Sequence, residues 1–492
     1  MVSGDHPLRE LLSRLPNPVH RLILGIGLLL ARVGLADEGR VRRTTDLAWP
    51  RILTGVARKS KTAVDIAMVG IAVGPAAIAG IGFAGPFWGL AFTVGGGLAT
   101  GTIALVSQRY GAEAFDRIGQ AVRTSALLVV ATTLPLTAAL FAFPTELIGL
   151  LTDDARAIDL GGAYLRIVAL GIPFAGLNLV GGRALIGADD ARTPMLIRGG
   201  GAVANIGINA ALIFGAGMGV VGAAVGTVAS NVLVTAVFGL GFAVGRLPGL
   251  GPFPVSFSLR GRYVDTATIR DVVRISIPAV GRRSVWTGAR FPLLAFVALF
   301  GSHVVAAYVI SRQVWGLINT PGWGFALAAS SLVGQSLGEN DEGLAEAYGH
   351  EIMRISVVTY AVGAAVVFLL ADPIAVQFVD DPTSETVPVT AALVRAAAVA
   401  VIARGVGGTY AGALDATGDT RWPFYSRVAG MFGVALPLTY LGATTTLGLW
   451  GLYVSYFGQS IVPAVVNRHR FSTGRWKAIS RRYRPDSTAV ND

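Results

Sequence analysis

Residues 199–245 decide the class of this protein, and they read GGGAVANIGINAALIFGAGMGVVGAAVGTVASNVLVTAVFGLGFAVG. The stretch contains no Asp, Glu, Lys or Arg. A helix needs about 20 apolar residues to cross a bilayer, so it can hold two crossings joined by a tight turn. Comparable uncharged stretches occur at 66–108 and 428–467. Because backbone groups in lipid must be hydrogen-bonded within helices or a closed barrel, we expect membrane helices here.

The whole chain follows this pattern. Hydrophobic residues make up 53% of it and charged residues only 14%, well below the roughly 25% of soluble domains. The spacing of charges predicts an all-α polytopic membrane protein with about twelve transmembrane helices. They are expected near 45–71, 76–106, 119–143, 159–187, 194–216, 219–245, 270–296, 303–335, 347–371, 388–415, 422–441 and 447–468.

The two halves of the chain repeat each other. Trp88-Gly-Leu90 recurs as Trp315-Gly-Leu317, an offset of 227 residues (315 − 88). Asp190-Ala-Arg-Thr-Pro194 is matched by Asp419-Thr-Arg-Trp-Pro423, an offset of 229. A register that drifts by so little indicates a duplicated domain. Since six helices is an even number, both copies enter the membrane from the same side, and we expect parallel six-helix repeats.

Basic residues orient the helices. They crowd the central segment 246–274 and the carboxy-terminal segment 468–484, whereas loop 152–159 on the alternate side is acidic. The positive-inside rule then places both termini in the cytoplasm of a multi-pass protein of the cell membrane. Loop 339–351 is an acidic exception on the same side. The net charge of +11 is thus attributed to topology and to contact with membrane lipid, with no nucleic-acid partner.

Five segments follow from these patterns. Leu22–Ala31 is an apolar run too short to span a bilayer, which favours an interfacial helix over a signal peptide. The predicted segments are a cytoplasmic or interfacial stretch at 1–43, an amino-terminal six-helix bundle at 44–246, a cytoplasmic linker at 247–269, a carboxy-terminal six-helix bundle at 270–470, and a basic cytoplasmic tail at 471–492.

Several motifs in order resemble the MATE (multidrug and toxic compound extrusion) transporters. They are Leu47-Ala-Trp-Pro50, Val106-Ser-Gln-Arg-Tyr-Gly111, the segment Tyr164–Pro173, the segment Ala184–Pro194 and the segment Asn205–Gly215. The resemblance covers residues 44–470 and is greatest to the prokaryotic DinF-like branch, in which the amino-terminal half holds the cation site. It implies two bundles in a V around a central cavity. It also implies export of small organic, often cationic, compounds by alternating access, driven by H⁺ or Na⁺.

The same resemblance implies a set of cation-coupling residues. Carried over position by position, they are Asp65, Asn205, Asn209, Ala223 and Thr227. Pro50 matches the proline at which the first helix of the family can bend. This chain departs from the family at Asn209, where a second carboxylate is common, so Asp65 is the only acid of the set.

The residues themselves allow two interpretations of this set. An ionisable residue within a span, such as Asp65, is rare and costly enough to indicate function. However, Lys61 lies one helical turn earlier, so a structural Lys61–Asp65 pair is equally available. The asparagines and Thr227 suit Na⁺ coordination or hydrogen bonds between helices. A Na⁺ at Asp65 is the one metal that the sequence suggests, and Lys61 and Pro50 are expected to modulate coupling. With one acid and a nearby lysine, proton coupling is favoured over Na⁺.

Arginines in the predicted spans form a second group of candidates. Arg58 lies in the first helix, and Arg282, Arg283 and Arg290 lie at corresponding depth in the seventh. An arginine near a helix end can extend its side chain to the membrane–water interface, which explains the arginines at such positions. A cavity lined by fixed positive charge would instead repel a cation and favour an anion. The sign of the substrate charge is therefore open.

Other functions lack support in the sequence. There is no cysteine, the five histidines are scattered, and no catalytic constellation or nucleotide motif occurs. We expect no enzyme and no cofactor beyond the coupling ion, and a secondary antiporter for drug-like compounds that acts as a monomer. The alternatives are a flippase for anionic lipid-linked intermediates of the same superfamily, a major-facilitator transporter, and a membrane enzyme or channel.

Overall fold

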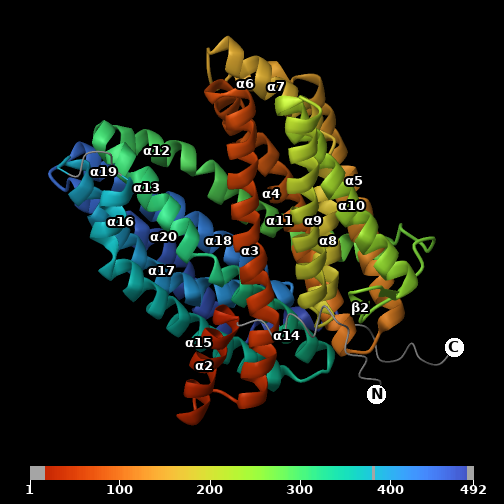
Figure 1. Cartoon of the computed structure of the whole chain (residues 1–492). Helices are drawn as coiled ribbons and strands as arrows, with labels where there is room; N and C mark the ends of the chain where they lie inside the picture. The colour runs from red at the N-terminus through yellow and green to blue at the C-terminus, as the bar shows by residue number, and fades with distance from the viewer. Residues whose placement is uncertain (1–16, 379–382, 485–492) are drawn as a thin grey trace. The chain divides into compact units, whose positions relative to one another are not determined.

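The computed structural model describes residues 17–378 and 383–484 and consists almost entirely of helices (Figure 1). In the first half, the spans are α3 (Glu38–Val73), α4 (Pro75–Gly111), α5 (Phe115–Ala142), α7 (Ala155–Ala169) with α8 (Ile172–Gly187), α9 (Arg192–Ala210) with the π-helix η1 (Ala211–Gly215), and α10 (Gly219–Val244). In the second half, they are α11 (Thr266–Gly288) with α12 (Arg290–Ala298), α13 (Ser302–Ile318) with α14 (Pro321–Gly338), α15 (Glu342–Leu369), α17 (Thr386–Ala416), α18 (Arg421–Val428) with η2 (Ala429–Ala435) and α19 (Leu436–Thr444), and α20 (Leu449–Ser472).

These twelve spans match the twelve predicted helices and confirm the all-α membrane class. Within the described residues, seven helices are individually long and apolar enough to cross a bilayer, and the pair α7–α8, bent by 49°, makes an eighth. The remaining spans are not individually long and apolar enough by this test, and the sequence and helix boundaries show why. α3 carries charges along its length, and the segments 266–298, 302–338 and 421–444 are each divided into shorter helices.

The duplication is visible in the elements. α4 covers Pro75–Gly111, and α13 and α14 together cover Ser302–Gly338, the same interval 227 residues later. α5 and α15 both have 28 residues, and each half contains one π-helix in the equivalent span. Positive φ angles also recur at equivalent positions of the two halves. Gly74 and Gly301 have φ of 107° and 99°, and Glu113 and Asn340 have φ of 54° and 63°. The left-handed conformation at a non-glycine residue is uncommon, so its recurrence at one offset supports a true repeat.

By packing, the described residues form two compact units. The first unit comprises residues 53–280, and the second comprises residues 17–52 together with 281–484. The first part of α3 therefore belongs to the second unit, and the first part of α11 belongs to the first. The predicted domain boundaries follow the sequence repeat and not this packing, and they stay a prediction. Residues 1–16 and 485–492 of the predicted terminal segments lie outside the described residues.

Two glycines show how these exchanged helix parts pack. In the first unit, a Cβ added at Gly97 of α4 would lie 2.2 Å from a methyl of Val280 on α11. In the second unit, a Cβ at Gly324 of α14 would lie 2.6 Å from the carbonyl oxygen of Ala48 on α3. Gly97 and Gly324 are equivalent positions of the repeat. At each position, the absence of a Cβ lets the neighbouring helix approach more closely than any other residue would allow.

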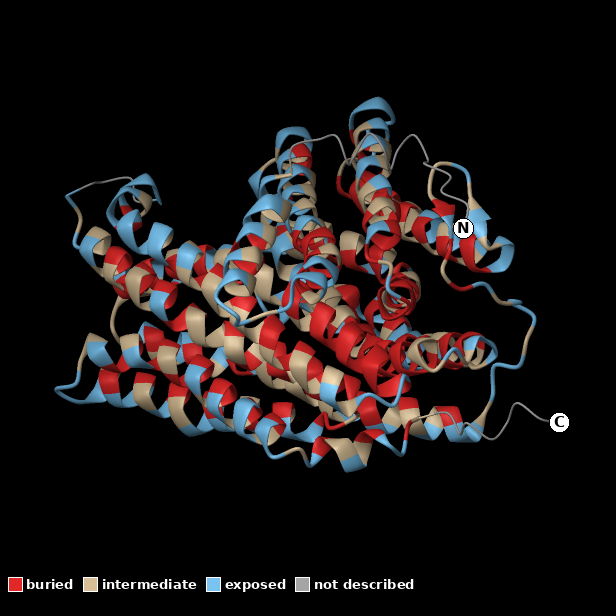
Figure 2. Ribbon diagram, turned by 90° about the horizontal axis from the view of Figure 1, so that it is seen from below, coloured by how far each residue is buried: buried red, intermediate tan, exposed pale blue. Residues whose placement is uncertain are grey.

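Buried residues run along one side of many helices, and exposed residues cover the other sides (Figure 2). Many of the exposed residues are large and apolar, for example Ile71, Leu150 and Leu369. Exposed apolar surface on this scale is expected where lipid replaces water.

Two short elements flank the spans. The helix α2 (Pro18–Arg32) begins at Asn17, whose side chain accepts a hydrogen bond from the His20 amide at 3.0 Å. It packs on α15 through one face and exposes leucines on the other, as an interfacial helix would. In the linker, β1 (Arg246–Leu247) and β2 (Gly251–Pro252) form a small antiparallel hairpin.

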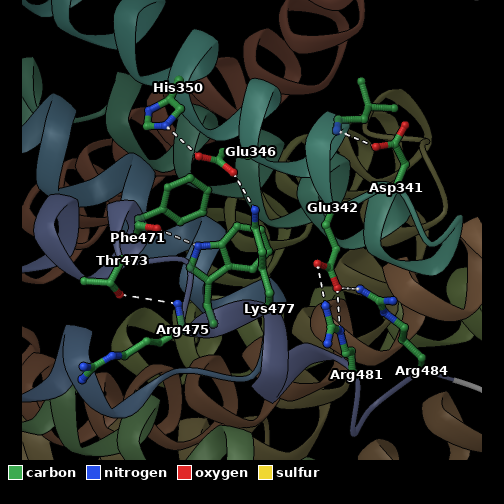
Figure 3. A network of polar contacts seen from close by, with 12 residues as sticks. Asp341, Glu342, Glu346, His350, Phe471, Thr473, Arg475, Lys477, Arg481 and Arg484 are labelled. Carbon is green, nitrogen blue, oxygen red and sulfur yellow. Dashed lines mark hydrogen bonds and ion pairs between the residues drawn. The ribbon is translucent and has the colours of Figure 1, made fainter.

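The acidic loop that interrupts the positive-inside pattern is neutralised by the tail (Figure 3). Glu342 accepts hydrogen bonds from Arg481 and Arg484, each at 2.8 Å, and Glu346 accepts one from Lys477 at 2.8 Å. The bond from Arg481 holds the pKa of Glu342 below its usual value. The tail includes the short helix α21 (Trp476–Ser480), whose Trp476 Nε1 donates to the Phe471 carbonyl at 2.7 Å. The glutamates of this segment therefore bind the basic tail.

Candidate functional site

Asp65 lies in α3 with its carboxylate held from two sides. Lys61 Nζ is 2.7 Å from Oδ2, one helical turn away on the same helix. Asn209 Nδ2 of α9 donates to Oδ1 at 2.9 Å. The two charged side chains are about one-fifth exposed. The intrahelical pair expected from the i,i+4 spacing is thus present, and it makes the site neutral overall.

A chain of polar side chains leads from this carboxylate into α10. Asn209 Nδ2 also donates to Asn205 Oδ1 at 3.2 Å. Asn205 Nδ2 in turn donates to Ser230 Oγ at 3.1 Å and Thr227 Oγ1 at 3.5 Å. Both asparagines are fully buried, and four residues separate them, so they occupy one face of α9. The structure therefore brings together four of the five residues that the resemblance implied.

Ala223, the fifth residue, lies beside this chain in an apolar cluster. Its neighbours there include Met68 and Val69 of α3 and Ile213 of η1. The methyl group of Ala223 supplies no ligand atom, so its side chain contributes packing. Pro50 lies inside α3 but in the other compact unit, and it takes no part in the network.

Three further residues around this network were not singled out from the sequence. Ser230 accepts from Asn205, and Tyr164 of α7 packs against the apolar cluster that contains Ala223 of α10. A Cβ at Gly226 would lie 2.0 Å from Asn209 Oδ1, so only glycine admits the amide there. Tyr164 was visible in the family motif, but its approach to α10 depends on helix packing that spacing does not reveal.

The orientation of the Asn209 amide limits the chemistry of the site. Its nitrogen faces two oxygen acceptors, whereas its buried oxygen has no hydrogen-bond partner. Towards Asp65 the amide is therefore a donor. Sodium prefers oxygen ligands, so a cation at Asp65 would require the amide to turn and Lys61 to leave. Protonation of the carboxylate also breaks the pair with Lys61, but it does not require the Asn209 amide to turn. Within residues 17–378 and 383–484, no group of three or more His, Asp or Glu could hold a metal ion.

The arginines predicted to carry cavity charge fall into different settings. Arg58 belongs to the first unit, with its Cζ 5.8 Å from the Phe92 ring centroid. Arg282 forms a two-pronged ion pair with Asp415 of α17, at 2.7 and 3.1 Å. Arg283 is half-buried on α11. Only Arg290 joins the second polar feature of the molecule, which lies in the second unit.

That feature is a stack of two indole rings surrounded by guanidinium groups. Trp286 of α11 and Trp315 of α13 have ring centroids 5.2 Å apart and planes inclined by 27°. Four arginine Cζ atoms lie 5.1 to 5.5 Å from the Trp286 centroid. We call this set the arginine–tryptophan cluster, and it consists of Arg290, Arg312, Arg404, Arg427, Trp286 and Trp315.

The cluster concentrates positive charge that no acid in the described chain neutralises. Since each Cζ lies within 5.5 Å of one centroid, any two are at most about 11 Å apart. At an effective dielectric constant near 20, each such pair repels by about 1.5 kcal/mol or more. Among described residues, no carboxylate pairs with any of the four, because Asp415 is occupied by Arg282. Contact with the indole faces offsets only part of this repulsion.

The sequence analysis singled out Arg290 but not the convergence of these side chains. Arg312 and Trp315 are three residues apart on α13 and share a helix face, whereas Trp286 lies on α11 and Arg290 begins α12. The meeting of side chains from the five helices α11, α12, α13, α17 and α18 at one point is a property of tertiary packing. Trp286 itself had no recognisable signal in the sequence.

Comparisons with known proteins agree with this architecture. The probable multidrug resistance protein NorM of Bradyrhizobium diazoefficiens is 27% identical over 440 residues, which cover 86% of this chain and 90% of that protein. The multidrug resistance protein PmpM of Pseudomonas aeruginosa is 28% identical over 445 residues, covering 87% and 91%.

Solved structures share the fold at lower identity. A MATE protein crystallised with MaD3S has a TM-score of 0.80 at 20% identity, covering 95% of this chain and all of that one. A MOP superfamily transporter from Pyrococcus furiosus, for which reverse polarity of the binding pocket suggests a different function, has a TM-score of 0.78 at 21% identity, covering 94% and 99%. The MatE family model matches residues 50–211 and 278–441, one match in each half. This chain belongs to the MatE family of membrane transporters.

Proposed function

We propose that this chain is a secondary active antiporter that exports drug-like organic compounds across the cell membrane by alternating access. The observation that carries the proposal is the Asp65 carboxylate, placed within a span and linked through Asn209 and Asn205 to α10. An ionisable side chain within a span is costly enough to favour a functional role. The relatives NorM and PmpM, both named multidrug resistance proteins, support drug-like substrates.

The coupling ion in this proposal is H⁺. Lys61 already occupies the place of a cation beside Asp65, and Asn209 offers that carboxylate an N–H instead of an oxygen. Proton binding neutralises Asp65 and breaks the ion pair, which changes the hydrogen bonds that connect α3 with α9. Na⁺ coupling is the alternative. No other cofactor is part of the mechanism.

The proposed topology has both termini in the cytoplasm of the plasma membrane. It rests on the basic central segment and tail, and the docked acidic loop removes the exception to the pattern. We place the protein in the DinF-like branch and treat it as a monomer.

The experiment is dye efflux measured in everted vesicles that contain the protein. A pH gradient and a Na⁺ gradient are imposed separately, against a panel of cationic and anionic dyes. Efflux driven by the pH gradient alone supports H⁺ antiport. Dye movement only down its own gradient would contradict active transport, and a strict Na⁺ requirement would contradict the choice of ion.

The arginine–tryptophan cluster favours one second candidate, a flippase for anionic lipid-linked intermediates. Four clustered guanidinium groups suit an anionic head group, and the Pyrococcus furiosus neighbour has a binding pocket of reverse polarity. Translocation of a fluorescent lipid pyrophosphate in proteoliposomes, without efflux of any soluble dye, would favour this candidate.

A further inference from the structure

We propose that the arginine–tryptophan cluster is a binding site for an aromatic organic anion, a planar ring system that carries a carboxylate, sulfonate or phosphate group. The inference rests on the proposed transport function only for its physiological use. Binding itself depends on the second unit alone, because every residue of the cluster belongs to that unit.

The donors at this site are incompletely used. Among described residues, Arg290 and Arg312 make no hydrogen bond to a protein acceptor and no ion pair. Arg404 Nε makes one long bond to Asn319 Oδ1 at 3.4 Å, and Arg427 Nη1 donates to the Gln459 carbonyl at 3.2 Å. A guanidinium group has five N–H donors in a planar fork that fits carboxylate and phosphate oxygens. Most of these donors are therefore free for a ligand.

The positions of Arg404 and Arg312 within their helices indicate that their unpaired charge has a partner inside the bundle. Arg404 lies twelve residues, roughly 18 Å along the helix axis, before the end of the 31-residue helix α17. Arg312 lies in the interior of α13. Arg404 is far from both ends of its helix, and the span that contains Arg312 continues beyond α13 into α14. A charge held within a span faces the bundle interior or a water-filled cavity and has a partner there. No carboxylate among the described residues is that partner, which leaves an anionic ligand as the candidate.

The ring stack defines the rest of the ligand. Trp286 is partly exposed, and Arg312 lies over both indoles, 5.1 and 4.8 Å from their centroids. Indole faces and guanidinium planes both stack on flat aromatic systems. Asp415, on the same helix as Arg404, is already bound by Arg282 and is not free to attract a cation. The site is thus built to accept an aromatic anion and to repel the equivalent cation.

Binding is tested with two dyes that share a xanthene ring and differ in charge, carboxyfluorescein (anionic) and rhodamine 123 (cationic). Fluorescence anisotropy is measured on the purified full chain in neutral detergent, with no gradient. We expect carboxyfluorescein to bind at least about tenfold more tightly than rhodamine 123, because charges of one sign line the site. Equal affinity for the two dyes would overturn the proposal.

Variants locate the binding. Arg312→Gln and Arg404→Gln should each weaken carboxyfluorescein binding by about tenfold, since each removes a buried charge contact. Arg395→Gln is the matched control, because Arg395 lies on the same helix as Arg404 but pairs with Asp372 outside the cluster. Its affinity should match that of the wild type. Equal loss in all three variants, or no loss in any, would contradict the site.

Two further measurements use the unaltered chain. If the glutamine variants do not purify, a rise in NaCl from about 50 to about 500 mM should still weaken carboxyfluorescein binding, and an affinity independent of salt would overturn the assignment. In nanodiscs, binding should be the same in phosphatidylcholine with or without phosphatidylglycerol. Loss of dye binding with phosphatidylglycerol would identify the anion as a lipid head group and refute a soluble aromatic ligand. Because no gradient is present, failure here is distinct from failure of antiport.

Discussion

Gly226→Ala tests whether the Asn209 amide is held where the network needs it. The added Cβ would lie 2.0 Å from Asn209 Oδ1 and 3.1 Å from its Cγ, so the amide must move. Overpacking in a filled interior costs about 1–3 kcal/mol. Displacing the amide also weakens its bonds to Asp65 and Asn205, each worth about 1 kcal/mol. The gain in helix propensity is about 0.5–1 kcal/mol. We therefore expect a net loss of about 2–4 kcal/mol.

Gly239→Ala is the matched control on the same helix, α10. The nearest atom to its Cβ would be Leu259 Cδ1 at 3.9 Å, an ordinary contact. This variant should be stabilised by about 0.5–1 kcal/mol. The thermal midpoint of the purified protein, followed by fluorescence-detected size exclusion, should fall by several degrees for Gly226→Ala and not for Gly239→Ala. Gradient-driven efflux should fall in parallel. Equal midpoints and equal efflux for the two variants would refute the account of Asn209.

Three other predictions follow from named contacts. Lys61→Ala should lower efflux driven by a pH gradient, because it removes the ion pair that holds one oxygen of the Asp65 carboxylate; dye efflux at equal amounts of protein measures this, and unchanged efflux would contradict a role for the pair. Arg282→Gln should destabilise the protein by about 3–5 kcal/mol, because it leaves Asp415, only 9% exposed, as an unpaired charge. Adding Asp415→Asn should recover most of this loss, and a double-mutant cycle of thermal unfolding measures the recovery. The pKa of Glu342 is lowered by its bond from Arg481, so the contact of the tail with Glu342 should persist through the usual carboxyl range and be lost only as pH drops through the lowered pKa. Spin-label distances between loop and tail measure this, and Glu342→Gln should lengthen them at every pH; distances independent of both pH and the substitution would contradict it.

Much of the fold was predictable because lipid imposes a simple constraint. Spans without charge identified the helices, and the constant offset identified the duplication. The breaks within spans were not predictable. The separation of α13 from α14 at Asn319–Thr320 and the bend between α7 and α8 depend on local hydrogen bonds and packing. The π-helices η1 and η2 likewise have no distinct pattern of apolar residues.

The candidate site was predictable only in part. Helical spacing predicted the Lys61–Asp65 pair, and the structure contains it. The contact between Asp65 and Asn209 joins residues 144 positions apart, and no periodicity reports such a distance. Family resemblance supplied those positions, and their role in coupling stays a prediction. The arginine–tryptophan cluster was not predictable as a site, because helical spacing relates residues on one helix only and the cluster forms where several helices converge.

The most direct test of the coupling mechanism is dye efflux in everted vesicles from cells that produce the wild type or Asp65→Asn in equal amounts. The amide keeps the size of the side chain and removes its charge. With a pH gradient imposed, we expect active efflux by the wild type and none by Asp65→Asn, while the amount of protein in the membrane is unchanged. Full gradient-driven efflux by Asp65→Asn would contradict the central role of this carboxylate.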